Sequence, residues 1–262
     1  MFNWLLFIDP ALAFPIVIVV SVIPITVTVL VTRRLFPYEA LKERHEVVSV
    51  VFSALELIYA VLLAFGVIVT WQGYDTASRN VTMEANKIAD LFADAKAFPE
   101  PTSSQIRRAL LNYARTILAD DWPAMGKLRA SPQTVSDARR ELWTEYFTID
   151  PRTLSNPQWF GESVRQLNTM SDFKRLRWWS ANQRMPEALW LVLLGLGLYS
   201  VVHLLFFGVR SLRWQLLMTN GLGASIACLL FLIFVLDHPF LGYSSVSSEP
   251  FQFIVAIFQR VT

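Results

Sequence analysis

The chain has 262 residues, of which 54% are apolar and only 17% are charged, and its mean hydropathy is +0.41. An ordinary soluble domain is less apolar than this, so the composition indicates an integral membrane protein. The formal net charge of +2 gives no electrostatic support for binding nucleic acid. The single cysteine, Cys228, excludes an intrachain disulfide.

Residues 11–32 form the first predicted membrane span, because they carry no charged side chain and are long enough to cross the hydrocarbon. Two prolines, Pro15 and Pro24, interrupt the span and are expected to kink its helix. Its polar side chains are expected to pack against the second span, and they are Ser21, Thr28 and Thr32.

Residues 45–71 form the second predicted span, which carries Glu56 near its middle. A charged side chain at the bilayer centre costs at least about 2.5–3.5 kcal/mol, so such a residue usually faces a bundle interior or a water-filled cavity. The polar residues of this span share one helical face, and they are His45, Ser49, Ser53, Glu56, Tyr59 and Thr70. The residues that we expect to line a pore are Ser49, Ser53, Glu56 and Tyr59. The alternative is that Glu56 is neutral or paired and only holds helices together.

The helical pattern continues from the second span to Phe98 without a proline, so the span is expected to run on as one long helix. Ser103 or Ser104 is expected to cap the next helix, which Trp122-Pro123 ends. The helices predicted after the long one cover residues 105–121, 134–149 and 159–183. The last of them leads into the third span. We therefore predict a helical extramembrane domain over residues 73–185, whose first and last helices are continuous with membrane spans.

Basic and aromatic side chains gather just before the third span. The cluster comprises Lys174, Arg175, Arg177, Trp178 and Trp179. Because such residues collect where a protein meets the membrane surface, we predict that they are membrane-interface anchors. A specific contact with a lipid is the alternative.

The third and fourth spans are predicted over residues 188–209 and 216–236, with a short turn between them. His203 is a candidate partner for Glu56 in helix pairing. Together with His45, it is also a candidate proton-sensitive group, since histidine titrates near neutral pH. Gly221 and Ser225 have the spacing that lets two membrane helices approach closely.

The tail, residues 250–262, is apolar but too short to span a membrane. It is expected to lie on the membrane interface, to re-enter a pore mouth or to pack on another subunit. The sequence thus predicts an all-α integral membrane protein with four transmembrane helices. Its predicted divisions are residues 1–72 with two spans, 73–185 with the helical domain, and 186–262 with two spans and the tail.

The basic residues give opposite indications of orientation. The short connections at 33–46 and 210–215 hold six Lys and Arg residues, which favours placing both connections in the cytoplasm and the helical domain outside. The cluster between Lys174 and Arg184 flanks a span closely and favours the reverse orientation.

Several segments together resemble a bacterial membrane-protein family described as bestrophin-like. They are YAVLLAFGVIVTWQGYDTAS at residues 59–78, Glu84-Ala85, Asn112-Tyr113-Ala114 through Asp121-Trp122, Pro186-Glu187-Ala188-Leu189-Trp190, and Leu236-Asp237-His238-Pro239-Phe240-Leu241-Gly242. The resemblance covers roughly residues 45–260. It implies kinship with bestrophin anion channels, which are oligomers surrounding one pore. The sequence has no dense acidic run resembling the calcium clasp of animal bestrophins, and no pore residue is carried over from the family.

We expect a homo-oligomeric ion channel with membrane lipids and inorganic ions as partners, because four spans leave too little protein for a pore within one subunit. An acidic ring at Glu56 favours cations, whereas the family resemblance implies anions, and we lean slightly towards cations. The alternative function is a structural or sensory membrane protein whose helical domain binds a partner. No catalytic motif, metal-ligand spacing or cofactor-binding loop is present, so we expect neither an enzyme nor a cofactor. The expected location is a bacterial cytoplasmic membrane.

Overall fold

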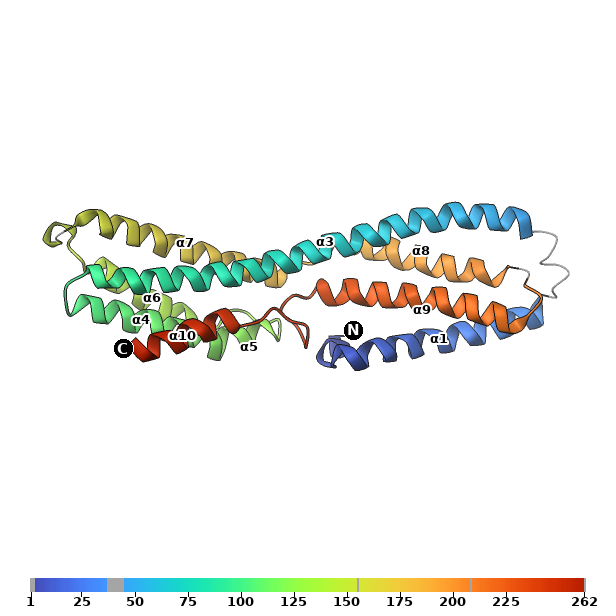
Figure 1. The fold of residues 1–262 in the computed structure, drawn as a ribbon, viewed down its shortest axis with the longest axis horizontal. Coiled ribbons are helices and arrows are strands. Elements are labelled where there is room, and N and C mark those ends of the chain that lie inside the picture. The colour runs from blue at the N-terminus through green and yellow to red at the C-terminus, as the bar shows by residue number, and fades with distance from the viewer. Residues whose placement is uncertain (1–2, 37–44, 155, 208, 262) are drawn as a thin grey trace. The chain divides into compact units, whose positions relative to one another are not determined.

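The computed structural model describes residues 3–36, 45–154, 156–207 and 209–261, and helices joined by short connections make up these ranges (Figure 1). The longer helices are α1 (Pro10–Leu35), α3 (His45–Asp94), α4 (Thr102–Thr116), α6 (Gln133–Phe147), α7 (Pro157–Asn182), α8 (Glu187–Leu205), α9 (Leu212–Leu236) and α10 (Glu249–Val261). The short helical turns are η1 (Asn3–Phe7), η2 (Ala95–Ala97), η3 (Ile117–Asp121), α5 (Trp122–Met125) and η4 (Pro151–Thr153). Because the described residues contain no strand, the prediction of an all-α protein is confirmed.

The chain divides into two compact units. The span unit consists of residues 1–73 and 184–238, and the helical unit consists of residues 74–183 and 239–262. Four described helical stretches are long and apolar enough to cross a membrane, and they include α1, the first part of α3, α8 and α9. The chain is therefore an integral membrane protein. Each unit has its own apolar core, and the larger one belongs to the helical unit.

Helix α1 begins where the Asp9 side chain accepts a hydrogen bond from the Ala11 amide at 2.8 Å and Pro10 occupies the first turn. Within the span unit α1 packs against α9 rather than against the polar face of α3, so the prediction for Ser21, Thr28 and Thr32 was wrong (Figure 1). Ser21 and Thr28 bond to carbonyls of their own helix. Such bonds satisfy a hydroxyl in an apolar setting without any partner helix.

Two residues of α9 make the close approach to α1. A Cβ atom added at Gly223 would collide with the end of the Ile25 side chain, so glycine lets the helices meet there without moving that side chain. Asn220 donates a hydrogen bond to the Thr26 hydroxyl at 2.9 Å. Gly221 has no such neighbour within 4 Å, and the Ser225 hydroxyl bonds to the Gly221 carbonyl of its own helix. Within the described chain Gly223, and not the pair of Gly221 and Ser225, makes the close approach to α1, so the close contact expected of that pair stays a prediction.

Helix α3 has 50 residues and continues from the span unit into the helical unit without interruption, as predicted. The last helix of the helical domain was also predicted to be continuous with a membrane span. In the structure four non-helical residues, Gln183–Pro186, separate α7 from α8. The physical reason is Pro186, which has no amide hydrogen to donate into a helix and lies at the N-terminal cap of α8.

The helical unit encloses a core shared by α3, α4, α6, α7 and α10. Pro101 is the cap residue of α4, and the Glu100 carboxylate accepts the Ser104 amide at 3.3 Å, so neither Ser103 nor Ser104 is the capping residue. The helical run that begins with α4 was predicted to end at Trp122-Pro123, but it continues past that point. A π-helical turn, η3, follows α4 and leads directly into α5, where the proline is tolerated because it lies in the first turn.

The C-terminal tail forms α10 and packs within its own chain. Phe251, Ile254 and Phe258 are buried in the core of the helical unit, and the rings of Phe92 and Phe258 stack with centroids 3.7 Å apart. None of the three placements predicted for the tail includes this contact. The sequence showed an apolar segment, but it did not identify the surface that buries its apolar face.

Candidate functional site

The polar residues of α3 in the span unit do not all face the same environment. Tyr59 is only 2% exposed, and a Cβ atom added at Gly197 of α8 would lie 2.6 Å from its hydroxyl oxygen. Thr70 is also buried, and its hydroxyl bonds to the Gly66 carbonyl. This part of the predicted pore-lining face therefore packs inside the span unit. The prediction that Tyr59 lines a pore was wrong for this reason.

Ser49, Ser53 and Glu56 lie beside that packed face, on a flank of α3. Ser53 is exposed, and its hydroxyl bonds to the Ser49 carbonyl at 2.9 Å. Ser49 and Glu56 are half-buried. The next residue along this flank is Ala60, which is small and exposed. We call Ser49, Ser53, Glu56 and Ala60 the polar flank of α3.

Glu56 is the charged residue of the polar flank. Its Oε1 atom is buried, and among the residues that the structure describes no hydrogen-bond donor reaches it. A buried carboxylate oxygen without a donor is unfavourable, so a partner from outside the described chain would stabilise it. Water, a cation or a neighbouring subunit can supply that partner.

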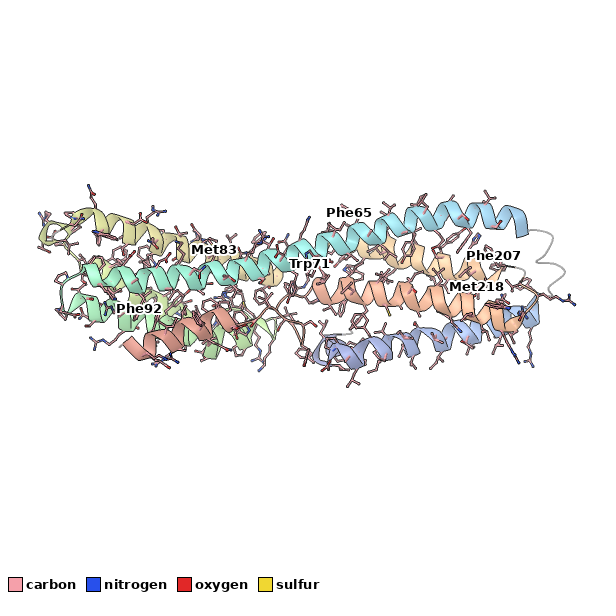
Figure 2. The ribbon with its side chains drawn as sticks, viewed as in Figure 1. Phe65, Trp71, Met83, Phe92, Phe207 and Met218 are labelled. Carbon is pink, nitrogen blue, oxygen red and sulfur yellow. The ribbon has the colours of Figure 1, made fainter. Side chains whose placement is uncertain are left out.

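The remaining surface of α3 in the span unit is apolar and exposed. Val50, Leu57 and Val61 are exposed on it, and Phe65 is 54% exposed. Phe65 is labelled in Figure 2. An apolar patch of this kind is stable against lipid or against another apolar protein surface, but not against water. It is consistent with a helix that lies in a membrane.

The ring of His203 stacks on that of Phe52, with centroids 5.4 Å apart and planes 19° apart. It also contacts the rings of Tyr199 and Phe207. His203 is thus part of an aromatic cluster between α3 and α8, and its pairing with Glu56 stays a prediction. His45 begins α3, but its side chain lies outside the described residues.

The predicted membrane-interface cluster is divided by burial. Trp179 is 71% exposed and Arg175 is exposed, so both can meet a surface. Lys174 and Trp178 are half-buried. Arg177 is 0% exposed, which contradicts its prediction as an anchor. On α7 the side chain of Arg177 points into the core of the helical unit.

Arg177 lies between two buried carboxylates. Its Nε atom is 2.7 Å from the Glu84 carboxylate on α3, and its Nη2 atom is 2.8 Å from the Asp121 carboxylate in η3. Tyr113 on α4 donates to Glu84 at 3.0 Å, and Trp178 donates to Asp121 at 3.0 Å. Four elements are thus joined through one guanidinium group. We call these five residues the Arg177 network.

An aromatic ring also contacts the Arg177 network. The guanidinium lies 5.7 Å from the centre of the Phe251 ring on α10, which adds a cation–π contact. Burial and the charge of Glu84 hold the pKa of the Tyr113 phenol well above its usual range. Tyr113 therefore remains a neutral hydrogen-bond donor. A satisfied buried network of this kind specifies how helices pack, and it offers no open position for a substrate.

A second buried carboxylate contact is found in the span unit. Asp237, at the C-terminal end of α9, accepts a hydrogen bond from the Met185 amide at 2.6 Å. Burial raises the pKa of the Asp237 carboxyl, and the bond from Met185 opposes this effect. The contact joins the end of α9 to the segment that precedes α8. Within the described part of the chain, no group of three or more metal-binding side chains is present.

The sequence matches the family described as bestrophin-like domain over residues 19–251. The chain belongs to the bestrophin-like family. A comparison with curated proteins found no match. The fold of this chain is similar to crystal structures of a bacterial bestrophin homolog from Klebsiella pneumoniae. One mutant form aligns with a TM-score of 0.71 at 13% identity, and the alignment covers 93% of this chain and 96% of that one. A second mutant form aligns with a TM-score of 0.64 at 15% identity, and the alignment covers 97% of each chain. Another structure of that homolog, solved by Zn-SAD phasing, aligns with a TM-score of 0.59 at 16% identity. The alignment covers 94% of this chain and 95% of that one.

The bestrophin-like motifs and the buried polar contacts coincide. Glu84, Tyr113 and Asp121 belong to segments on which the family resemblance rests, and Asp237 belongs to another. In this bestrophin-like chain these motif residues hold helices together. Sequence reasoning missed the Arg177 network, although one signal was available. Glu84 interrupts the apolar face formed by Val81, Ala85 and Ile88, and a carboxylate there requires a buried partner.

Proposed function

We propose that the chain is one subunit of an oligomeric ion channel, whose pore is lined by the polar flank of α3 and slightly favours cations. Kinship with bestrophin channels supports the channel function at the level of the family. The single observation that supports a cation path is Glu56, a half-buried carboxylate within a membrane span whose Oε1 atom has no donor among the described residues. A ring of such carboxylates attracts cations.

Assembly of several copies is part of the proposal. The cavity found among the described helices of the span unit has a volume of about 760 Å³ and an apolar lining that includes Trp4, Val20 and Phe231. An apolar cavity of this kind suits lipid or a neighbouring subunit better than ions. A water-filled path formed by the polar flank therefore needs neighbouring copies. We also propose that these assemblies lie in a bacterial cytoplasmic membrane.

The test is ion flux from liposomes that contain the purified protein, with potassium and chloride gradients measured separately. We expect potassium flux in the wild type, and a reduced potassium preference in Glu56→Gln, which removes the charge but keeps the shape. Glu141→Gln is the matched control, because Glu141 is exposed on α6 of the helical unit and accepts a hydrogen bond from the Asn112 amide in its own unit.

Two results would overturn the proposal in different ways. Chloride flux that Glu56→Gln leaves unchanged would contradict the cation path and leave Glu56 with a packing role. If a folded, reconstituted protein gives no flux at any pH or voltage, the channel itself is contradicted. The helical unit would then be tested as a partner-binding module.

A further inference from the structure

A small cavity in the helical unit is lined by basic and hydroxyl side chains. Its volume is about 240 Å³, and its lining residues are Ser131, Arg139, Ser171, Lys174, Arg175 and Trp178. Arg139 comes from α6 and Ser171 from α7, so two helices form its walls. The volume corresponds to about eight water molecules. It accommodates a small polyatomic anion with some of its hydration water.

Two buried hydrogen-bond donors of cavity-lining residues have no partner among the residues that the structure describes. The Nε atom of Arg139 and the Oγ atom of Ser171 are both buried, and nothing among the described residues accepts from them. Ser171 as a whole is only 6% exposed. Buried donors in folded proteins are normally satisfied by protein, water or a ligand. Both donors therefore lack an acceptor, and both belong to residues that line the cavity.

The charges around the cavity are unbalanced. No ion pair within the described part of the chain involves Arg139 or Lys174, whereas Arg175 at the exposed rim pairs with Asp172. The carboxylate beside the cavity, Asp121, already accepts hydrogen bonds from Ser131 at 2.7 Å, from Arg177 at 2.8 Å and from Trp178 at 3.0 Å.

Three cations face two carboxylates in this region. The cations are Arg139, Lys174 and Arg177, and the carboxylates are Glu84 and Asp121, so one positive charge remains uncompensated. Burial lowers the pKa of the Lys174 ammonium. The charge of Asp121 opposes this, while the charges of Arg139 and Arg177 add to it. An anion in the cavity would offset the repulsion among these cations.

We propose that this cavity is an oxyanion-binding site that takes a phosphate group through Arg139, Lys174 and Ser171. A guanidinium donates along fixed directions that match phosphate oxygens, and an ammonium adds a compact point charge. The phosphate group can belong to free inorganic phosphate or to a phospholipid head. Either source presents the same oxygens to the same donors.

A bound oxyanion would also contact the side chains that hold the Arg177 network in place. Ser131 and Trp178 line the cavity and at the same time donate to Asp121. A ligand that binds only the folded protein raises its stability in proportion to occupancy. The site is therefore expected to stabilise the helical unit when it is filled.

The test uses the full-length protein in detergent, titrated with inorganic phosphate against sodium chloride of equal ionic strength. We expect a saturable rise in the midpoint of thermal unfolding and a binding isotherm by calorimetry. Arg139→Gln and Lys174→Gln should each weaken binding by about tenfold or more, since each removes a charged donor. Ser171→Ala should weaken it less and tests the site with minimal risk to folding.

Arg140→Gln is the matched control, because Arg140 neighbours Arg139 on α6 but is exposed and paired with Asp137. It should bind phosphate as the wild type does. Phosphate also stabilises proteins in general through exclusion from their surfaces. The specific effect is therefore the difference between the wild type and the Arg139→Gln variant.

A second arm separates the two sources of the phosphate group. The same variants are titrated with short-chain phosphatidylglycerol and, separately, with phosphatidylcholine. Saturation by inorganic phosphate supports a soluble ligand. Saturation by phosphatidylglycerol alone, lost in Lys174→Gln, supports a lipid head. If neither ligand binds saturably, or if the variants bind as the wild type does, the site is overturned.

Discussion

At the scale of single residues, Arg177 has the largest consequence for the helical unit. It is fully buried and forms ion pairs with both Glu84 and Asp121. Its position before a span and beside tryptophans is typical of an interface anchor, and the sequence alone favours that interpretation. Its partners precede it by 93 and 56 positions, a pairing that local patterns do not reveal.

Replacing Arg177 by methionine should destabilise the helical unit by about 3–5 kcal/mol, because two buried carboxylates lose their common partner. Thermal unfolding followed by circular dichroism in detergent measures the change. Arg140→Met is the control and should cost at most about 1 kcal/mol, since that ion pair is exposed. Adding Glu84→Gln and Asp121→Asn to Arg177→Met should recover part of the loss. If it recovers none, lost packing rather than uncompensated charge is the cause.

At the scale of elements, the helices were predictable, but several of their contacts were not. The long apolar runs and the absence of proline after Trp71 predicted α3, because length and periodicity are local properties. The partner of each helix face depends on shape. Gly223 meets Ile25, while Gly221 meets no side chain within the described chain. Likewise, Tyr59 belongs to a polar stripe in sequence but to a packed face in the structure.

The crossing of α3 and α8 gives a prediction at this scale. Gly197→Ala would place a Cβ atom 2.6 Å from the Tyr59 hydroxyl and 3.2 Å from Ile226, so it should destabilise the span unit by about 1–3 kcal/mol. Gly195→Ala on the same helix meets nothing within 4 Å and should be close to neutral. Both effects can be measured as shifts in thermal unfolding in detergent.

A double variant tests the assigned contact. Tyr59→Phe removes the hydroxyl that the new methyl group would strike, so Gly197→Ala should cost clearly less in the Tyr59→Phe background. Equal costs in the two backgrounds would show that the Tyr59 hydroxyl is not the obstacle.

At the scale of the whole molecule, two buried tyrosines make stability depend on alkaline pH. Burial raises the pKa of Tyr146 to about 12 and holds that of Tyr113 well above its usual range, against about 10 in an unfolded chain. A raised pKa means that the folded protein holds the proton more tightly. The stabilising effect is therefore complete below about pH 10 and is lost as the pH rises towards 12 and beyond.

For Tyr146 alone, the loss should reach about 3 kcal/mol, because each tenfold difference in proton affinity between the folded and unfolded chain is worth roughly 1.4 kcal/mol. Unfolding of the protein in detergent, followed between pH 9 and 12 together with tyrosinate absorbance, measures it. Tyr146→Phe should flatten this alkaline decline, whereas Tyr243→Phe, at an exposed site, should not. A decline equally steep in Tyr146→Phe would assign the effect to other groups.

Membership of the bestrophin-like family and the four-span architecture followed from segments of the sequence that are contiguous. The candidate site was predictable only in part. Glu56 was apparent because a charge within an apolar span is conspicuous, and its Oε1 atom lacks a donor among the described residues. The cavity beside Arg139 was not apparent from the sequence, because its walls come from two separate helices, α6 and α7. It is recognised by buried donors that have no partner among the described residues.

The number of residues in the π-helical turn η3 determines which way Asp121 points. Asp121 is its last residue and faces Arg177, and a helix turns by about 100° for every residue added or removed. Deleting Ala119 would restore a regular α-helix, which looks harmless by propensity alone. It would nevertheless rotate Asp121 away from the guanidinium while the rest of α4 stayed in register. Insertions and deletions between residues 117 and 121 should therefore be far rarer among functional variants than substitutions at exposed positions of the same turn.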